Sequence, residues 1–403
     1  MIVAVYGIPR CGKDTFIGEV LNKKPNSLHI KGSQKLNDLS IEHFDRKFKE
    51  LDDAQQNAIR ILFAKYADGL KTKFDLVIVD GHYSVPDGNS FKKVFTDEDL
   101  LLYDAFFYLN RTPDEISRNY RNGDKKEYEN LLLSSDKVKE WIEYEISHMK
   151  KEVEGAEKDF IVLDSDPFAV DYVCSFNQTT KETAFRIVKE IRSIAGDKNI
   201  VLTDLDKTVS INDLTYDFIR NSGLDPLLPK IVFKDDYYTD YQFASFHRYL
   251  MKSSNFDESI DYSLEKLILN NDLINDLRNL KKESVIIAIT TGMVDAWSKK
   301  NQKLMVLDKI YGFSKEQHLV VSPFLKMLIA RYLSKTNKTI AIGDSIIDIG
   351  MLLESNKGYL VSMAKLDKRI VNCFNSKEIE ANILQPPYST FKYDFLKEDT
   401  LKW

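Results

Sequence analysis

Short apolar runs separated by longer polar segments recur along the first half of the chain. The runs IVAVY (2–6), FDLVIVDG (74–81), DAFFYLN (104–110) and DFIVLDS (159–165) predict buried strands, and SLHIKG near residue 30 predicts another. These runs are too short for helices and are rich in the β-branched and aromatic residues that strands favour. Because strands that alternate with helices form a parallel sheet covered on both faces, we predict a doubly wound α/β domain.

A second series of apolar runs follows residues 192–198, RSIAGDK, which we interpret as the join between two domains. This series predicts a second open α/β sheet from the runs NIVLTDLD (199–206), SVIIAITT (284–291), HLVVS (318–322), KTIAIGD (338–344) and KGYLVSM (357–363). The predicted organisation is therefore a first domain at 1–196, a second domain at 197–385 and a C-terminal tail at 386–403.

Helical patterns fill the segments between the predicted strands. An amphipathic helix is expected at about 13–21 and a long polar helical stretch at roughly 41–70. Residues 209–283 are also helical in pattern, and they separate the first two strands of the second series. This segment is too long for a simple connection, so we predict an inserted helical cap.

The composition is that of an ordinary globular protein. The chain has 403 residues, of which 43% are hydrophobic and 30% charged, and its formal net charge is −5. This charge argues against a broad basic surface that coats nucleic acid. The three cysteines (Cys11, Cys174 and Cys373) lie far apart and are expected to be reduced thiols. No apolar run has the length of a membrane span, so we expect a cytoplasmic protein without a membrane partner.

The segment after the first strand, GIPRCGKDT, has the pattern of a phosphate-binding loop. Gly7 and Gly12 bracket the loop and Lys13 follows, as in G-x-x-x-x-G-K. Glycines let backbone N–H groups turn toward an anion, and the start of the following helix adds its positive dipole end. Lys13 would bind the β- and γ-phosphates of ATP, with Arg10 and Thr15 beside it. A tight turn with an incidental lysine is the alternative.

This first domain resembles the nucleoside monophosphate kinases, and its GKDT variant is similar to that of the deoxynucleoside monophosphate kinases. Asp14 stands where the pattern usually has Ser or Thr, so Asp14 or the adjacent Thr15 would reach Mg²⁺. Asp80 ends an apolar strand, and the resemblance implies that it contacts the metal shell or the acceptor. The turn VDGHYS, with His82, is similar to the Asp-x-His turn of archaeal-type adenylate kinases. A strand-end Asp that caps a turn and a locally packed His are the structural alternatives.

Further basic residues follow the fourth strand, in LNRTPDEISRNYRNGDKK. Arg111, Arg118 and Arg121 resemble the lid arginines that neutralise the transferring phosphate in nucleotide kinases. A solvated helix face explains the same residues without any function. Ser33 lies where the acceptor pocket of these kinases begins.

In the second domain, the segment DLDKT after the first strand resembles motif I of the haloacid dehalogenase superfamily, D-x-D-x-T. The other elements of that family's site follow in order along the chain. The candidate residues are Asp204, Asp206, Thr208, Thr290 (or its neighbour Thr291), Lys326, Asp344 and Asp348.

The resemblance implies a role for each of these side chains. Asp204 would attack phosphorus, and Asp206 would first protonate the leaving oxygen and then activate water. Thr290 would hold a phosphoryl oxygen, and Lys326 would offset the repulsion between two anions. Mg²⁺ would be bound by Asp204 and Asp344, with Asp206 and Asp348 as further candidates. A second Asp two residues after the nucleophile indicates phosphate transfer rather than dehalogenation.

Roughly 80 residues separate Thr208 from Thr290, a spacing that resembles the phosphoserine-phosphatase-like branch with its helical cap. Such caps allow only small molecules to reach the site. The cap is aromatic, and its aromatic and neighbouring residues form either a stacking surface for a base or simply the cap core. They are Tyr237, Tyr238, Tyr241, Phe243, Phe246, His247 and Arg248.

Three functions fit these motifs. The first is a bifunctional enzyme that joins an ATP-dependent kinase to a Mg²⁺-dependent phosphatase for nucleotides or small phosphomonoesters. The second is a polynucleotide kinase/phosphatase, which has the same domain order; its kinases carry Asp-x-x-Arg after the second strand, whereas Asp38 and Asp45 here lack an Arg three residues on. The third is a phosphatase regulated by a non-catalytic ATP-binding domain.

Overall fold

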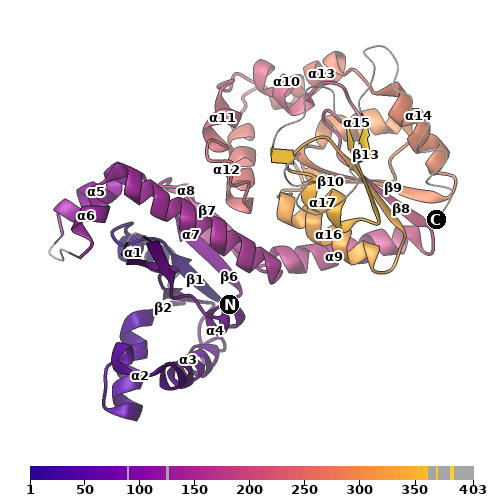
Figure 1. Cartoon of the computed structure of the whole chain (residues 1–403). Coiled ribbons are helices and arrows are strands. Elements are labelled where there is room, and N and C mark those ends of the chain that lie inside the picture. The colour runs from indigo at the N-terminus through magenta and orange to yellow at the C-terminus, as the bar shows by residue number, and fades with distance from the viewer. Residues whose placement is uncertain (89, 124–126, 362–368, 371–381, 385–403) are drawn as a thin grey trace. The chain divides into compact units, whose positions relative to one another are not determined.

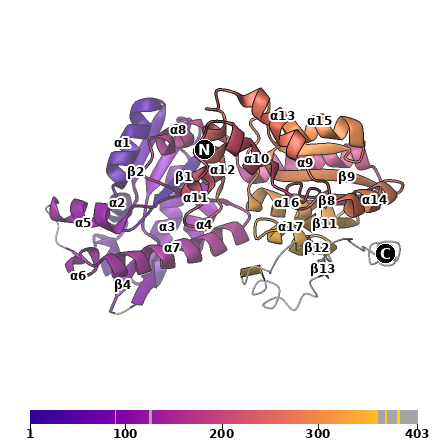
Figure 2. The ribbon, with the colours of Figure 1, turned by 90° about the horizontal axis from the view of Figure 1, so that it is seen from above.

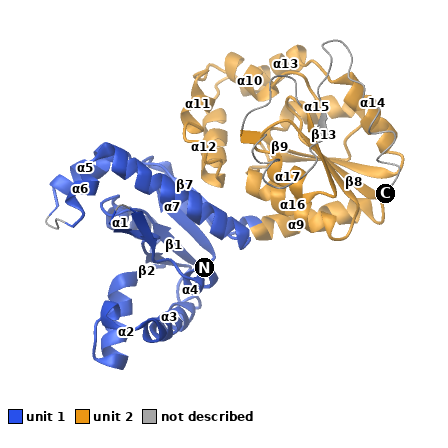
Figure 3. Ribbon diagram, viewed as in Figure 1, with its two compact units in different colours: residues 1–180 blue, residues 181–403 orange. Residues whose placement is uncertain are grey.

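The computed structural model describes residues 1–88, 90–123, 127–361, 369–370 and 382–384 (Figure 1). It divides into two compact units, residues 1–180 and 181–403 (Figure 3). Each unit is built on a parallel sheet with helices packed against it, as the alternation of the apolar runs predicts. Among the described residues, every helix is too short or too polar to cross a bilayer.

The first unit contains a five-stranded sheet in the order β2-β3-β1-β6-β7. Its strands are parallel throughout, and β1, β6 and β7 are buried along their whole length. Strands that are covered on both faces must be apolar at every position, which explains the unbroken runs in the sequence. The strands are β1 (Ile2–Tyr6), β2 (Ser27–Lys31), β3 (Leu76–Asp80), β6 (Ala105–Leu109) and β7 (Asp159–Leu163).

Helices cover this sheet on both sides, with α1 and α8 on one side and α7 on the other (Figure 2). A short antiparallel hairpin of β4 (Ser84–Asp87) and β5 (Ser90–Lys93) lies outside the sheet. The helices are α1 (Lys13–Lys23), α2 (Gly32–Phe44), α3 (Asp53–Asp68), α4 (Asp97–Leu102), α5 (Pro113–Arg121), α6 (Glu129–Leu132), α7 (Ser135–Gly155) and α8 (Phe168–Ser175).

The long helical stretch expected at 41–70 is two helices rather than one. Helix α2 ends where Asp45 adopts a left-handed conformation (φ 51°), and a short 3-10 turn at Phe48–Glu50 follows. Helix α3 then begins behind Asp52, whose carboxylate accepts a hydrogen bond from the Gln55 N–H. An N-cap of this kind satisfies a free donor of the first turn, so the chain starts a new helix there.

The second unit contains a six-stranded sheet in the order β10-β9-β8-β11-β12-β13. Successive residues of its central strands point to opposite faces, and each face has its own core: Val201 packs in one cluster and Leu202 in the other. The strands are β8 (Asn199–Thr203), β9 (Ser284–Met293), β10 (Lys309–Phe313), β11 (Thr339–Gly343), β12 (Lys357–Val361) and β13 (Asn382–Leu384).

The helices of the second unit divide between these two cores. Those of the first core include the inserted cap segment, α10 (Leu214–Asn221), α11 (Leu228–Val232), α12 (Asp240–Leu250) and α13 (Phe256–Lys266), followed by α14 (Asn271–Leu280) and α15 (Asp295–Leu304). Those of the second core are α9 (Thr180–Ala195), α16 (Pro323–Ser334) and α17 (Ile349–Glu354).

Two sequence-based expectations differ from the structure. The units divide at residues 180 and 181, not at 196, because α9 buries Ile187 and Ile191 in the second core. The expected strand at 318–322 is absent: Ser322 instead caps α16 by accepting a hydrogen bond from the Leu325 N–H, and β10 pairs with β9 at that edge. The predicted tail at 386–403 lies outside the described residues.

Candidate active sites

The carboxyl ends of β8 and β11 bring a buried group of charged side chains together in the second unit. Lys326, near the start of α16, is only 1% exposed, and its ammonium donates to Asp204 Oδ1 at 2.8 Å and to Asp348 Oδ1 at 2.7 Å. Burial acts to lower the pKa of Lys326, but the two carboxylates outweigh it and raise that pKa. Lys326 is therefore charged and fixed between its partners.

Asp344 completes this group on the side of β11. Ligand oxygens of Asp204, Asp344 and Asp348 all lie within 4.8 Å of one another. Burial raises the pKa of Asp344, and the carboxylates of Asp348 and Asp204 raise it further. Burial likewise raises the pKa of Asp204, to about 6, despite the contact with Lys326. Three carboxylates around one ammonium leave an excess of negative charge, which a hard divalent cation such as Mg²⁺ would neutralise.

The hydrogen bonds of Asp348 distinguish it from the other two carboxylates. Its Oδ2 accepts from the N–H of Asp344 at 3.3 Å and from the N–H and hydroxyl of Ser345 at 3.2 and 2.9 Å, while Oδ1 contacts Lys326. Both of its oxygens are therefore engaged by protein donors. Asp204 and Asp344 are the better candidates to hold a cation, and Asp348 fixes the loop that carries Asp344.

Asp206 lies apart from this cluster and contacts other elements. Its Oδ2 accepts from the Thr215 hydroxyl at 3.1 Å, and its Oδ1 accepts from the Trp297 indole N–H at 3.0 Å. Its side chain is thus not placed among the grouped metal-ligand candidates. Burial raises the pKa of Asp206 to about 7, and the nearby Asp213 carboxylate adds to this effect. Near neutral pH this carboxyl can therefore both donate and accept a proton.

Threonines and a large cavity complete the arrangement. Thr290 is buried in β9, and its hydroxyl accepts a hydrogen bond from the Gly292 N–H at 3.1 Å. Thr208 donates to Asp344 Oδ1 at 3.3 Å. Asp204, Asp206, Thr290, Thr291 and Asp344 line one cavity of about 740 Å³. The other predicted residues, Lys326, Asp348 and Thr208, do not line this cavity. They form hydrogen bonds with Asp204 or Asp344, which do.

The aromatic cap residues fall into two groups. Phe243 and Phe246 line the cavity together with Phe233, which the sequence analysis did not single out. Tyr241 and His247 are buried within the unit; burial lowers the pKa of His247 to about 4, and its Nε2 contacts the Thr291 carbonyl oxygen at 3.1 Å. The remaining candidates, Tyr237, Tyr238 and Arg248, are not among the lining residues of this cavity.

Replacing Lys326 by methionine should destabilise the second unit strongly. The substitution keeps the length of the side chain but leaves Asp204 and Asp348 buried without a counter-charge, which typically costs about 3–5 kcal/mol. The measurement is urea unfolding in the presence of a chelator, with Lys303→Met on the exposed part of α15 as the control. An unfolding free energy within about 1 kcal/mol of the wild type would contradict the buried arrangement.

In the first unit, the loop after β1 has the backbone shape that an anion site requires. Gly7 (φ 148°), Arg10 (φ 72°) and Gly12 (φ 86°) all have positive φ, and Gly12 is the N-cap of α1. A Cβ at Gly7 would lie 2.7 Å from Cys11 Sγ, so only glycine fits there. Lys13 reaches back across the loop and donates to the Gly7 carbonyl at 2.7 Å. The segment is thus wrapped rather than extended.

A cavity of about 620 Å³ opens beside this loop. Arg10, Gly12, Lys13, Asp14 and Thr15 line it, and across it lie Asp80 and His82. The loop and the carboxyl end of β3 therefore face a common space. The Asp14 side chain is exposed and lies 3.7 Å from the Lys31 ammonium.

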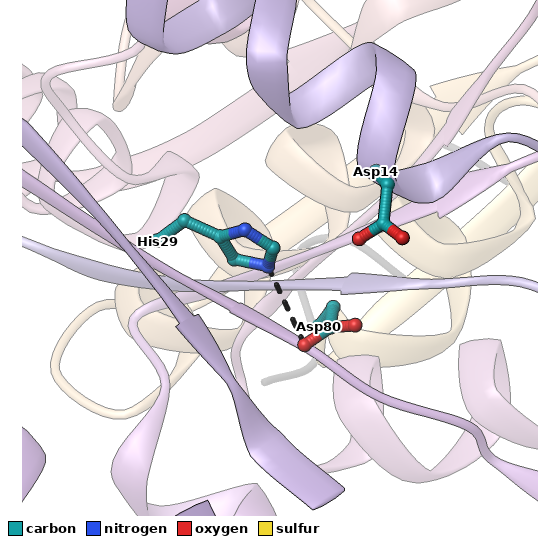
Figure 4. Close-up of side chains that lie close together, drawn as sticks. All are labelled: Asp14, His29 and Asp80. Carbon is teal, nitrogen blue, oxygen red and sulfur yellow. Dashed lines mark ion pairs between the residues drawn. The ribbon is translucent and has the colours of Figure 1, made fainter. Parts of the chain in front are cut away.

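Asp80 is held by two neighbours on one of its oxygens. Oδ1 accepts from the Gly32 N–H at 3.0 Å and lies 3.4 Å from His29 Nε2. Burial acts to raise the pKa of Asp80, but the contacts with His29 and Gly32 outweigh it and keep that pKa low. Ligand atoms of Asp14, His29 and Asp80 lie within 4.8 Å of one another (Figure 4), so this group fits a divalent cation next to the loop.

A second cavity of about 670 Å³ adjoins the first and shares Asp80 and His82 with it. Ser33 lines this neighbouring cavity. Burial, together with the charge of Lys13, lowers the pKa of His82 to about 3. The imidazole is therefore neutral, and its buried Nδ1 has no hydrogen-bond partner among the described residues.

The three arginines that follow β6 do not all line the same cavity. Arg111 and Arg118 line a smaller cavity of about 300 Å³ that also contacts Gly12 and Thr15. Arg121 lines none of these three cavities in the described part of the first unit. Arg111 and Arg118 thus share a cavity with residues of the loop, whereas Arg121 lies at the end of α5.

Three residues at these sites were missed by sequence reasoning. Trp297 and Thr215 bind Asp206 from α15 and α10, and His29 binds Asp80 from β2. None belongs to a motif, and Trp297 is 91 positions from its partner. The only signal available was indirect, since a tryptophan or histidine in a mostly apolar segment needs a polar partner when it is buried.

No family model matches the chain, and no curated protein matches it. Among solved structures, it is similar to a substrate-bound phosphoserine phosphatase complex, with 18% identity over 43% of this chain and 90% of that chain and a TM-score of 0.35. It is also similar to a HAD-family hydrolase from Salmonella enterica subsp. enterica serovar Typhi, with 17% identity over 53% of this chain and 80% of that chain and a TM-score of 0.39.

A third similar structure is described as the Pnkp1/Rnl/Hen1 RNA repair complex. The identity is 12%, the match covers 91% of this chain and 96% of that chain, and the TM-score is 0.25. At such scores the likeness of the whole folds is slight. The side chains of the two sites are the stronger guide to their chemistry.

Proposed function

We propose that the chain is a bifunctional enzyme with an ATP-dependent kinase site in its first unit and a Mg²⁺-dependent phosphatase site of the haloacid dehalogenase type in its second. The substrates are nucleotides or related small phosphomonoesters. The observation that carries the proposal is the convergence of Asp204, Asp344 and Asp348 on the buried Lys326, beside Asp206 and a cavity of about 740 Å³.

In the proposed phosphatase reaction, a carboxylate oxygen of Asp204 attacks phosphorus while the bond to the leaving oxygen breaks. Asp206 donates a proton to that oxygen, which its raised pKa permits near neutral pH. Asp206 then takes a proton from the water that attacks the aspartyl phosphate, so that inorganic phosphate leaves and Asp204 is restored. Mg²⁺ held by Asp204 and Asp344 would supply positive charge against the phosphoryl oxygens.

In the proposed kinase reaction, the residues of the first unit mainly bind and orient. The backbone N–H groups of the wrapped loop and the ammonium of Lys13 bind the phosphates of ATP. Asp14 and Asp80, with His29 holding Asp80, would bind Mg²⁺, which supplies charge neutralisation between the phosphates. The acceptor lies in the adjoining cavity, next to Asp80 and His82. The γ-phosphoryl group passes to an acceptor oxygen and ADP is released.

The acceptor cavity favours a small phosphorylated acceptor over the 5′-hydroxyl end of a polynucleotide. A phosphate acceptor is already ionised and needs no carboxylate to remove a proton. Asp38 and Asp45, the two carboxylates that follow β2 where polynucleotide kinases carry theirs, are exposed and line neither cavity beside the loop; the carboxylates that do line the second cavity are Asp80, Glu98 and Asp99, from other elements. This supports the mononucleotide reaction as the primary one.

The proposal is tested by incubating the protein with γ-labelled ATP, Mg²⁺ and a panel of nucleoside monophosphates and 5′-hydroxyl oligonucleotides. Label transfer to one or more monophosphates is expected, together with release of phosphate from small phosphomonoesters in separate reactions without ATP. Transfer to oligonucleotides alone would favour polynucleotide end repair. Phosphatase activity without any transfer would leave the first unit as a regulatory ATP-binding domain.

A further inference from the structure

The cavity above Asp204 is lined on its cap side by two kinds of side chain that the phosphatase chemistry does not use. One kind is cationic, Arg220 at the end of α10 and Lys230 in α11. The other is apolar and aromatic, and it includes Phe233, Phe243 and Phe246. Because the phosphoryl group is bound at the bottom by residues of the core, these cap residues face the leaving group.

The two cationic residues are at most weakly paired with carboxylates of the protein. The acidic residues of the same lining have other partners: Asp213 pairs with Lys207 at 3.0 Å, and Asp217 accepts from Asn212 at 2.6 Å. Arg220 forms a long ion pair with Asp217 at 4.0 Å and packs over the Tyr216 ring, 4.4 Å from its centroid. Lys230 is exposed and pairs with no carboxylate among the residues that the structure describes. An exposed cation without a carboxylate beside a phosphate-binding site attracts a second anion.

The aromatic residues form a platform with one accessible ring. Phe233 packs against Phe243, with ring centroids 5.0 Å apart, and against Phe246, at 5.5 Å; Tyr238 stacks on it at 5.9 Å, so a further ring has only its remaining surface to pack on. Phe243 and Phe246 are buried, whereas Phe233 is only half-buried. Leu227, 56% exposed, lines the same side of the cavity. A planar apolar group can therefore pack on Phe233 without disturbing the core of the cap.

The size of the cavity agrees with a large leaving group. Its volume of about 740 Å³ lies in the range of pockets that enclose whole cofactor-sized or drug-sized ligands. A phosphorylated amino acid or glycerol phosphate contains neither a planar ring for Phe233 nor a second phosphate for Lys230. A nucleotide with two separate phosphate groups contains both.

We propose that the phosphatase site binds nucleoside bisphosphates, with one phosphate at Asp204, the base on Phe233 and the second phosphate at Arg220 and Lys230. The inference rests on the phosphatase function proposed above. The phosphoryl group passes to Asp204 as the nucleoside monophosphate leaves, and water then hydrolyses the aspartyl phosphate to inorganic phosphate. The nucleoside monophosphate belongs to the class of acceptor proposed for the kinase site.

The test compares the hydrolysis of adenosine 3′,5′-bisphosphate, adenosine 3′-monophosphate and glycerol 2-phosphate in steady-state assays with Mg²⁺. We expect kcat/KM for the bisphosphate to exceed that for the monophosphate by about tenfold or more. The variant Arg220→Met/Lys230→Met should raise KM for the bisphosphate to that of the monophosphate with kcat unchanged. Lys234→Met, an exposed cation that does not line the cavity, is the matched control.

Phe233→Leu provides an independent arm, because it keeps an apolar side chain and removes only the ring. It should raise KM for both nucleotides several-fold and leave glycerol 2-phosphate unaffected. Equal kcat/KM for the bisphosphate and the monophosphate, or an equal effect of the double variant on all three substrates, would overturn the inference. So would a clear preference for a 3′-phosphorylated oligonucleotide over the bisphosphate.

The same assays separate this inference from the function on which it rests. If the wild-type protein with Mg²⁺ hydrolyses none of these phosphomonoesters, the phosphatase function itself is wrong. If its kcat/KM for glycerol 2-phosphate equals that for the nucleotides, the phosphatase function holds and only the assignment of the cap residues fails.

Discussion

Replacing Asp204 by asparagine is expected to lower phosphomonoester hydrolysis by about 10⁴-fold or more while ATP-dependent transfer stays at the wild-type rate. The amide keeps the shape of the side chain but cannot form the aspartyl phosphate of the proposed reaction. Asp204 is buried beside Lys326, so no neighbouring carboxylate can easily take its place: Asp348 has both oxygens engaged and Asp206 is held by Trp297 and Thr215. Phosphate release measures the loss.

The control for this substitution is Asp197→Asn, an exposed carboxylate before β8 that should leave both activities unchanged. Thermal unfolding of both variants checks that the fold is retained. Asp204→Asn removes one of two carboxylates from Lys326, and the second, Asp348, keeps the ammonium paired. Loss of both activities in a folded Asp204→Asn variant would contradict the division into two sites.

The fold could be predicted largely because both sheets are parallel and covered on both faces. Such strands are apolar at consecutive positions, so β1, β3, β6, β8 and β11 stand out from their polar surroundings. Strand β10 lies at the edge of its sheet and has the sequence KIYGF, with a lysine and a glycine that hide the pattern. The HLVVS run is more apolar, but its last residue caps a helix.

The boundary between the units shows a different limit of the sequence. A glycine and charged residues at 192–198 have the composition of a linker, yet α9 ends there with its apolar face packed in the second core. Composition shows where a chain is polar, but it does not show which neighbouring sheet an amphipathic helix covers. The real division at 180 and 181 falls just where α9 begins.

At the candidate sites, the predictable residues are those whose chemistry requires a short local pattern. The loop from Gly7 to Lys13 needs its glycines in sequence, and Asp204 and Asp206 need their spacing after a strand. Residues that act through another side chain have no such pattern. Trp297 binds Asp206 because the fold brings α15 to the end of β8, and its neighbours in sequence do not show this. Whether each motif residue takes its proposed role remains a prediction for experiment.

Replacing Lys13 by alanine is expected to have the reverse effect of Asp204→Asn. ATP-dependent transfer should fall by about 10³-fold, because the Lys13 ammonium is a full positive charge held across the loop and it would stabilise the transferring phosphoryl group. Phosphomonoester hydrolysis should stay unchanged, since Lys13 belongs to the first unit and lines the cavity beside the loop. Transfer of label from ATP and release of phosphate are measured on the same preparation.

Lys73→Ala, which removes an exposed lysine of the first unit, is the control for charge and should retain both activities. A Lys13→Ala variant that still transfers phosphate at the wild-type rate would show that the loop is not the donor site. The same assays distinguish a kinase from a regulatory domain. Suppose that neither the wild type nor Lys13→Ala transfers label, and that ATP alters phosphate release by the wild type alone. The loop then binds ATP only to control the second unit. Loss of transfer with unaltered phosphate release, with or without ATP, is the result that two independent catalytic sites require.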